Sequence, residues 1–380
     1  MSDVSPPPPT PSEEKATSRT GNSRLRTFVI WGNVAYAVLL VALYGALRLM
    51  AESWWPATAA LYLPRWPWML PTIPLGIAAW FVWRQGVWLP IVGALLVLGP
   101  IAGLRLPQLG ERPRGQEIRV VTLNIQNGKP NLPASLGEIE RFEPHLLLCQ
   151  EVDYEQRELE ESAAAAGLVH VRYDSHFWTA ATSPLRLVEV VESQTSFRDI
   201  CAVYEWEGPT EAAGTMDTAR QLFVVNVHLS TARHGLVNLR PTSPLTGTGL
   251  QELAEHQHLR AAEIGELAAT LDELSQRGDV IVAGDFNMPT DSPWFAALLR
   301  DRVSAFDVAG RGYGYTVPND AGDLWPRGVC WLRVDHVLAG GLGVRAARPG
   351  RASGSDHRGM FAKLVRPSRE PALASGEGSP

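Results

Sequence analysis

Apolar residues are concentrated in three runs near the N-terminus, and none of these runs contains a charged residue. They cover residues 28–47, 66–83 and 86–104. At a rise of 1.5 Å per helical residue, the twenty residues of the first run span the hydrocarbon core of a bilayer, about 30 Å. The pattern therefore predicts a transmembrane region of about three helices within residues 27–105.

Prolines interrupt the second and third runs, and membrane helices tolerate proline where the freed backbone groups find partners. A re-entrant helical pair is the alternative for these two runs. The first run is too long for a signal peptide, and no small-residue cleavage site follows it. Eight of the 13 tryptophans lie between Trp31 and Trp88, several near the ends of the runs. This placement is typical of the aromatic belts at membrane interfaces.

The basic residues that flank the runs predict the orientation, because Lys and Arg favour the cytoplasmic side. The flank 15–26 carries four of them and the turn at Arg84 carries one, whereas the longer loop 48–65 carries two. The N-terminus is therefore expected in the cytoplasm, and three crossings place the chain after residue 104 outside. Three arginines beyond the third run oppose this orientation: Arg105, Arg112 and Arg114.

Beyond a linker at residues 106–116, short β-branched runs alternate with longer amphipathic segments, which predicts one α/β or α+β domain over residues 117–366. Strands are expected at 119–124, 146–150, 202–206, 222–228, 280–283 and 334–339. Helices are expected at 134–142, 155–166, 250–274 and 293–300. The polar ends of the chain, residues 1–26 and 367–380, cannot bury enough apolar surface to fold and are predicted to be disordered tails.

Charge and cysteine content exclude several classes of protein. Residues 117–366 contain 23 Lys and Arg against 33 Asp and Glu, a net charge of −10. Strong non-specific nucleic-acid binding depends on basic residues that neutralise phosphates, so this balance disfavours nucleic acid as a partner. The three cysteines have no paired spacing, so they predict neither a disulfide framework nor a zinc site.

The segment 278–293, GDVIVAGDFNMPTDSP, is the most informative stretch of the domain. Its short apolar run predicts a buried strand that ends at Gly284, just before Asp285 and Asn287. In an extended chain both side chains would point to the same face. A turn capped by Asp and Asn is the structural alternative for these two residues.

Other predicted strands also end in polar groups that a protein core does not need. Each of these groups alone is explained by a turn, a helix cap or a core histidine, but their joint occurrence indicates a site. They are Asn124, Gln150, Glu151, Asn226, His228, Asp335, Ser355, Asp356 and His357.

The motifs LNI, QE, NVHL, GDFN, RVDHV and GSDH follow one another in this order between residues 119 and 364. Together they resemble the endonuclease/exonuclease/phosphatase superfamily, which includes deoxyribonucleases and neutral sphingomyelinases. The resemblance implies an α+β fold, a four-layer α/β/β/α sandwich of two mixed β-sheets, here preceded by the transmembrane region. It also implies metal-dependent hydrolysis of phosphoesters at strand ends along one edge of the sandwich.

The resemblance assigns roles to individual residues. Mg²⁺, with Mn²⁺ as the alternative, takes oxygen ligands, and Glu151 is expected as the main ligand with Asn124 and Asp356 in support. Arg333 and Ser355 are expected to support the site from behind. The expected catalytic residues are Asp285, which holds the attacking water; Asn287, which orients it; His357, paired with Asp335; and His228, which contacts the phosphate or the leaving group.

The chain departs from the family pattern in two places. Where the family often has Arg followed three residues later by Gln, this chain has Arg260 followed by Glu263. Residues 230–249 form a long Pro, Gly, Ser and Thr-rich segment, which is either a loop that covers the site or a plain insertion.

The sequence thus predicts an integral membrane hydrolase that acts on a phosphoester outside the cytoplasm. A tether to the lipid bilayer raises the local concentration of lipid substrates, so a phospholipid headgroup is favoured. A metal-dependent nuclease is the alternative enzyme. A binding or scaffold protein without catalysis is the alternative of another class.

Overall fold

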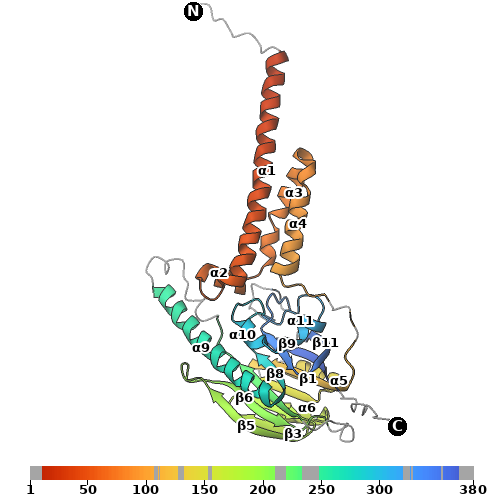
Figure 1. The fold of residues 1–380 in the computed structure, drawn as a ribbon. Helices are drawn as coiled ribbons and strands as arrows, with labels where there is room; N and C mark the ends of the chain where they lie inside the picture. Colours follow the sequence, from red (N-terminus) through yellow and green to blue (C-terminus); the bar gives the residue numbers. More distant parts are fainter. Residues whose placement is uncertain are drawn as a thin grey trace, which may run out of the picture. The chain divides into compact units, whose positions relative to one another are not determined.

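The computed structural model describes the chain except for residues 1–10, 107–109, 111, 127–131, 153–155, 210–219, 233–247, 320–325, 327, 352–353 and 368–380. The chain forms two compact units: the first consists of residues 1–46 and 65–104, the second of residues 47–64 and 105–380. Among the described residues, the first unit is entirely helical and the second contains every strand (Figure 1).

The helices of the first unit follow the predicted apolar runs. They are α1 (Pro11–Leu49), which continues into the second unit, η1 (Trp66–Met69), α3 (Thr72–Val82), η2 (Arg84–Gly86), α4 (Trp88–Leu96) and η3 (Val97–Ile101). Two stretches, Ser23–Leu49 and Arg84–Ile101, are long and apolar enough to cross a membrane. The third, Trp66–Val82, is shorter, and Pro71 lies at the break between η1 and α3.

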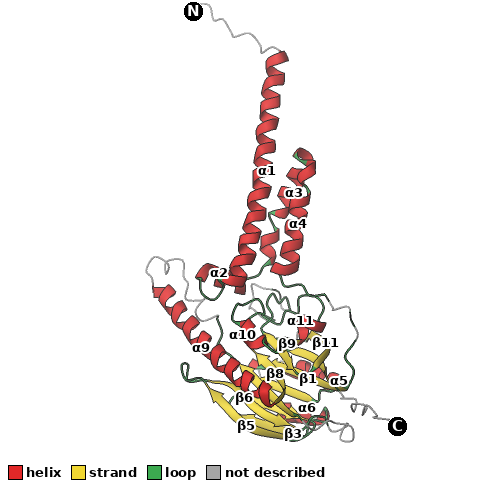
Figure 2. Ribbon diagram, in the orientation of Figure 1, coloured by secondary structure: helices red, strands yellow, loops and turns green. Residues whose placement is uncertain are grey.

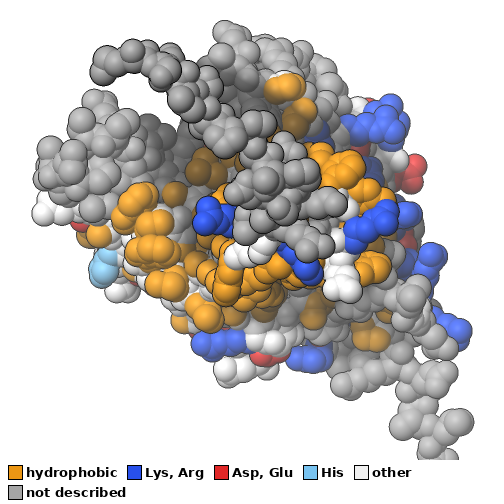
Figure 3. Space-filling model, turned by 90° about the horizontal axis from the view of Figure 1, so that it is seen from above, with side chains coloured by type: hydrophobic (Ala, Val, Ile, Leu, Met, Phe, Trp, Pro, Cys, Tyr) orange, Lys and Arg blue, Asp and Glu red, His pale blue; other side chains and the backbone are white. Residues whose placement is uncertain are grey.

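The apolar surface of the first unit is largely uncovered. Only 22% of the apolar window of Ser23–Leu49 and 28% of that of Arg84–Ile101 are buried, which argues against core helices of a soluble fold. Phe28, Phe81 and Trp88 are among the most exposed large side chains. Figure 3, a view from above, shows groups of hydrophobic side chains interspersed with Lys and Arg.

The helix α1 begins at Pro11, so residues 11–26 are helical where the sequence predicts a disordered tail. The physical reason is that a long apolar helix, once formed, extends at little cost because each added residue gains a backbone hydrogen bond. Residues 1–10 and 368–380, the remaining parts of the predicted tails, lie outside the described residues.

Two six-stranded mixed sheets form the centre of the second unit. The order in the first sheet is β11 (Gly343–Pro349), β12 (Met360–Arg366), β1 (Gln116–Asn124), β2 (Leu146–Gln150), β4 (Phe177–Ala181) and β3 (His170–Asp174). The order in the second sheet is β5 (Leu185–Glu192), β6 (Asp199–Trp206), β7 (Gln221–His228), β8 (Gly278–Asp285), β10 (Asp335–Gly340) and β9 (Arg302–Ser304). Each sheet has one parallel pair, β1 with β2 and β7 with β8.

Helices cover the outer faces of both sheets (Figure 2). They are α5 (Leu132–Phe142), α6 (Gln156–Ala165), α9 (Thr248–Arg277) and α10 (Phe295–Leu299). The unit also contains α2 (Trp55–Tyr62) and α11 (Ala305–Ala309). One apolar cluster lies between the sheets. A second joins the second sheet to α9 and α10, and a third joins the first sheet to α5 and α6. The predicted four-layer sandwich is confirmed.

Six strands were not expected from the sequence: β3, β4, β5, β9, β11 and β12. All six lie at or next to a sheet edge. In β3 and β5, the segments HVRYD and LRLVEVVE, partly exposed apolar residues alternate with polar ones, so no short apolar run marks the strand.

A buried amide joins the two sheets. Asn226 of β7 in the second sheet is fully buried, and its Nδ2 donates to the carbonyl oxygen of Cys149 at 3.1 Å and to Thr179 Oγ1 at 3.0 Å, both in the first sheet. Its Oδ1 accepts from Gln150 Nε2 at 2.7 Å. Asn226 therefore holds the sheets together just behind the strand ends, rather than facing the site as the sequence suggests.

We expect Asn226→Ala to lower the free energy of unfolding by about 3 kcal/mol, because it leaves several buried polar groups without partners. Denaturant unfolding of the full chain in detergent, followed by tryptophan fluorescence, measures the change. Gln221→Ala is the matched control on the same strand, since Gln221 makes only an exposed hydrogen bond to Glu205. The control should cost less than about 0.5 kcal/mol, and an equal loss in both variants contradicts the role given to Asn226.

Candidate active site

Strand ends from both sheets bring the candidate residues together. In the second sheet, the last residue of β7, His228, is in register with the last residue of β8, Asp285. Asp285 is in register with Asp335, the first residue of β10. In the first sheet, the last residue of β1, Asn124, pairs with Gln150 at the end of β2. Residues in register on adjacent strands point to the same face, so the row across β7, β8 and β10 concentrates its polar groups on one face.

Gly284 allows β7 and β8 to approach closely just before this row. A Cβ atom at position 284 would lie 2.0 Å from the carbonyl oxygen of Val227 on β7, a distance that no side chain can adopt. The glycine before Asp285 therefore has a packing reason as well as its place at the end of an apolar run.

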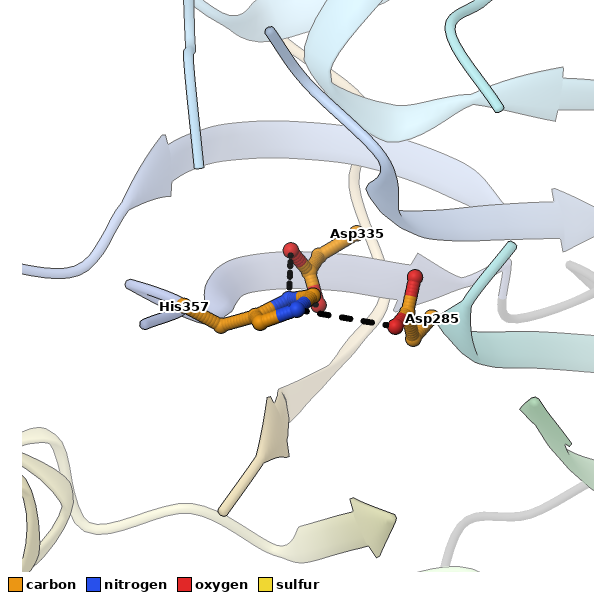
Figure 4. Close-up of side chains that lie close together, drawn as sticks. All are labelled: Asp285, Asp335 and His357. Atoms are coloured by element: carbon orange, nitrogen blue, oxygen red, sulfur yellow. Dashed lines mark hydrogen bonds and ion pairs between the residues drawn. The ribbon is translucent and has the colours of Figure 1, made fainter. Parts of the chain in front are cut away.

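His357 and Asp335 form a hydrogen-bonded pair (Figure 4). The imidazole Nδ1 lies 2.9 Å from Asp335 Oδ2 and 3.1 Å from Oδ1, and its Nε2 lies 3.7 Å from Asp285 Oδ2. Burial by itself lowers the pKa of an imidazole, but the carboxylates of Asp335 and Asp285 outweigh this effect and raise the pKa of His357 to about 10. The ring is therefore positively charged at neutral pH.

Asp285 is fully buried, and this burial raises its pKa to about 7. The charge of His357 and the hydrogen bonds from Asn287 and Asn124 act in the opposite direction, while Asp335 acts in the same direction as burial. A carboxyl group with this pKa exchanges a proton readily near neutral pH.

Asn287 contacts Asp285 through a turn rather than along an extended strand. Its backbone N–H donates to Asp285 Oδ1 at 2.8 Å, and its Nδ2 donates to Asp285 Oδ2 at 3.1 Å. A second bond from Nδ2 reaches the carbonyl oxygen of Leu229 at 2.8 Å. The backbone of Asn287 is left-handed, with φ 49°, so the expected strand alternation is wrong here and the turn and the site coexist.

Asn124 connects the two sheets at the site. Its Nδ2 donates to Glu151 Oε1 at 2.9 Å and to Asp285 Oδ2 at 3.1 Å. Its Oδ1 accepts from the backbone N–H of Gln126 at 2.9 Å. In this arrangement Asn124 orients two carboxylates, and its own oxygen is engaged with the backbone.

The predicted metal-binding carboxylates offer the oxygen atoms that a hard divalent cation prefers. Glu151 follows β2 with a left-handed φ of 54°, and its side chain remains about one third exposed. Asp356 Oδ2 accepts from Gln126 Nε2 at 3.1 Å, whereas its buried Oδ1 has no hydrogen-bond partner among the described residues and lies 3.9 Å from His357 Nε2. A buried carboxylate oxygen without a donor fits a cation ligand.

A second group of possible ligands consists of Asp285, Asp335 and His357, whose ligand atoms lie within 4.8 Å of one another. His357 Nδ1 is already hydrogen-bonded to the carboxylate of Asp335. These three residues therefore fit a hydrogen-bonded acid–base group better than a set of ligands that are free to bind a cation.

His228 lies beside the carboxylates, with Nε2 at 3.4 Å from Glu151 Oε1 and 4.0 Å from Asp285 Oδ2. Burial lowers the pKa of His228 well below its usual range, and the neighbouring His176, Arg198 and His357 act in the same direction. The neutral ring can donate or accept one hydrogen bond at Nε2.

Several supporting residues differ in what they contact. Ser355 Oγ donates to the carbonyl oxygen of Asn124 at 2.7 Å and accepts from the N–H of His357 at 3.1 Å, as a supporting residue should. Arg333 donates to Thr290 Oγ1 at 2.9 Å and to Asp307, neither of which is a predicted site residue, so its expected support of the site stays a prediction.

Glu263 takes up the place for which the family pattern leads one to expect Gln. Its carboxylate accepts from the N–H and the Oγ of Ser230, at 2.8 and 2.7 Å, just after His228. Of the segment 230–249, residues 233–247 lie outside the described residues, so its predicted role stays a prediction.

Two residues near the site gave no signal in the sequence. His176 packs edge-on against His228, with ring centroids 5.1 Å apart, and Gln126 binds both Asn124 and Asp356. Both stand next to strand ends, and it is the pairing of β2 with β4 that places His176 beside the end of β2, where Val152 N–H donates to its carbonyl oxygen at 3.3 Å.

The chain is similar to several solved structures. Truncated TDP2 from Caenorhabditis elegans is 16% identical, with 66% of this chain and 98% of that chain covered and a TM-score of 0.45. A mannosyl-6-phosphatase from Bacteroides thetaiotaomicron is 14% identical, with 65% and 99% covered and a TM-score of 0.46. The human Nocturnin catalytic domain is 18% identical, with 65% and 93% covered and a TM-score of 0.43. No curated protein matches the chain.

A family match covers more than half of the chain, residues 121–357, and includes every predicted site residue. Its limits fall within β1 and at the histidine that pairs with Asp335. The chain belongs to the Endonuclease/Exonuclease/phosphatase family.

Proposed function

We propose that this chain is a membrane-anchored, divalent-metal-dependent phosphoester hydrolase. The observation that carries the proposal is the convergence of carboxylates, amides and imidazoles from both sheets at one edge, with Asn124 within hydrogen-bond distance of both Glu151 and Asp285. Hydrolysis of a phosphoester requires relief of negative charge on the phosphate and proton transfer from the attacking water. Groups for both tasks lie at this edge.

The proposed roles follow from the protonation states. Asp285, with a pKa of about 7, accepts a proton from the attacking water, and the Asn287 amide keeps the carboxylate oriented. His357, positively charged and fixed by Asp335, contacts a phosphate oxygen. The neutral His228 donates to the phosphate or to the leaving oxygen.

Glu151 and Asp356 would hold Mg²⁺ or Mn²⁺, with Asn124 as the third predicted ligand. When bound, the cation would neutralise charge on the phosphate and polarise its oxygens. The hydrogen bonds of Asn124 favour a role in which it orients Glu151, unless its amide turns to present the oxygen.

The substrate class follows from charge and anchoring. The net charge of −10 over residues 117–366 disfavours tight binding of nucleic acid. The exposed apolar helices of the first unit would hold the enzyme at a bilayer and raise the local concentration of lipid phosphoesters. We therefore favour phospholipid headgroups as substrates.

The division of the chain supports an anchor of three crossings. Residues 47–64 belong to the same compact unit as residues 105–380, and Trp331 Nε1 donates to the carbonyl oxygen of Tyr62 at 3.1 Å. A compact unit lies on one side of a bilayer, so the helices between residues 64 and 105 would cross it an even number of times. With the N-terminus in the cytoplasm, the catalytic domain lies outside.

Removal of divalent metal should abolish hydrolysis. We expect EDTA to stop turnover of bis(p-nitrophenyl) phosphate, and added Mg²⁺ or Mn²⁺ to restore it. Parallel assays on phospholipid and on nucleic acid identify the substrate class. Glu151→Gln should weaken metal binding by about tenfold or more, measured by calorimetry. EDTA-insensitive hydrolysis contradicts the metal assignment, and no turnover on any of the three substrates favours a binding protein.

We expect Asp335→Asn to lower kcat on the order of 10²- to 10⁴-fold, because the charged imidazole of His357 loses the carboxylate that holds it. Steady-state kinetics with the same bis-ester measure the effect, and circular dichroism checks the fold. Asp301→Asn, the same substitution at an exposed position, is the control and should leave kcat unchanged. An active Asp335→Asn variant contradicts the proposed role.

Fusion of a reporter at the C-terminus tests the orientation. A reporter that is active only in the cytoplasm should give no signal, because the positive-inside rule places the catalytic domain outside. The same reporter fused before residue 23 is the control and should be active. A strong signal from the C-terminal fusion reverses the proposed topology.

A further inference from the structure

The segment between the first and second apolar runs, residues 47–64, is part of the catalytic unit and not of the helical unit. We call it the connector. It contains α2, whose residues Ala57, Thr58 and Leu61 are buried. Thr58 Oγ1 accepts from Gln257 Nε2 of α9 at 3.1 Å, so the connector packs against the helix that follows β7 in the chain.

A carboxylate of the connector lies inside the catalytic unit. Glu52 has a fully buried side chain and a left-handed backbone, with φ 72°. Its Oε2 accepts from Arg260 Nη1 at 2.8 Å, and its Oε1 accepts from Tyr62 Oη at 2.6 Å and from Ser292 Oγ at 3.3 Å. Burial of a charged group without a partner is strongly unfavourable, so Glu52 and Arg260 depend on each other.

Arg260 also donates hydrogen bonds to two backbone carbonyl groups that follow strand ends of the active site. Its Nε donates to the carbonyl oxygen of Ser230 at 3.0 Å, two residues beyond His228. Its Nη2 donates to Tyr62 Oη at 2.6 Å and to the carbonyl oxygen of Asn287 at 3.3 Å. Tyr62 Oη lies 3.4 Å from the same Asn287 oxygen.

The contact at Asn287 falls where the backbone needs support. Asn adopts the left-handed region more readily than other non-glycine residues, but the conformation still costs free energy that contacts such as these offset. The amide groups of Asn287 fix both oxygens of Asp285, so a rotation of the residue changes the position of the carboxylate. Small displacements of this kind reduce catalysis strongly, because reacting groups must be aligned closely.

We propose that Glu52, together with Tyr62 and Arg260, forms a positioning assembly that holds Asn287 and the end of β7 in their catalytic geometry. The connector between the first two apolar runs then contributes to the geometry of the active site, in addition to linking two helices. This inference rests on the proposed hydrolase function. None of the three residues touches the reacting groups, so they act through Asn287 and Ser230.

The test uses the full chain in detergent micelles with Mg²⁺ and bis(p-nitrophenyl) phosphate. Glu52→Gln removes the charge that pairs with Arg260, and Tyr62→Phe removes one hydroxyl. We expect kcat to fall about tenfold or more in both variants with KM nearly unchanged, at a temperature at which both remain folded. Unchanged kcat in both variants overturns the proposal.

Asp272→Asn is the matched control. Asp272 lies on α9 like Arg260 and pairs with a buried arginine, Arg302, at 2.9 Å, but within the described part of the chain its ion pairs, with Arg300 and Arg302, do not reach the site. The control should keep kcat within about twofold of the unmodified chain. A loss in the control equal to that in Glu52→Gln shows a general effect of destabilisation and overturns a positioning role.

Two further measurements separate positioning from stability. In an Asn287→Ala background, Tyr62→Phe should have no further effect on kcat, because its route to Asp285 is already lost. Hydrogen exchange of residues 285–292 should be faster in Glu52→Gln and unchanged in Asp272→Asn. This second measurement needs no turnover, so it decides the proposal even if the unmodified chain hydrolyses none of the phosphoesters, which would refute only the hydrolase function.

Discussion

The buried carboxylate of Asp285 is the constraint on which the site depends. Removing a carboxylate from water is costly unless hydrogen bonds and opposite charge compensate. Asn124 and Asn287 donate to it, and the imidazolium of His357 lies 3.7 Å away. These three residues come from different segments of the chain. The burial of Asp285 is therefore stable only when those segments are folded next to one another. Its raised pKa shows that the compensation is incomplete, which keeps the group ready to take a proton.

The sheet topology explains why these segments meet. The parallel pairs, β1 with β2 and β7 with β8, end at the same edge of the sandwich. The antiparallel β10 begins there, so its first residue, Asp335, joins the row. Polar groups at strand ends lie outside the apolar layers, so they can remain polar without burial in the core. Next to these strand ends, Asn226 connects the two sheets by hydrogen bonds. Fold and site therefore share one geometric origin, the common edge of two sheets.

The sequence predicted the sandwich and the convergence at its edge because buried central strands are short β-branched runs that stop at polar residues. Edge strands such as β3 and β11 lack this pattern, since one side of each faces solvent or a loop. The conformation of Asn287 could not be predicted, because the turn and the extended chain have the same sequence signature. Glu52 could not be recognised either: it stands in a short loop between two apolar runs, and its partner follows 208 residues later.

The separation between Glu52 and Arg260 has a consequence for biogenesis. The ribosome delivers Glu52 early, but α9 emerges only after both later apolar runs and seven strands of the second unit have been made. Until α9 has been made, Glu52 has no buried partner, and an unpaired carboxylate is far more stable in water than in an apolar layer. The burial of Glu52 is therefore tied to the docking of a segment from the C-terminal half of the chain.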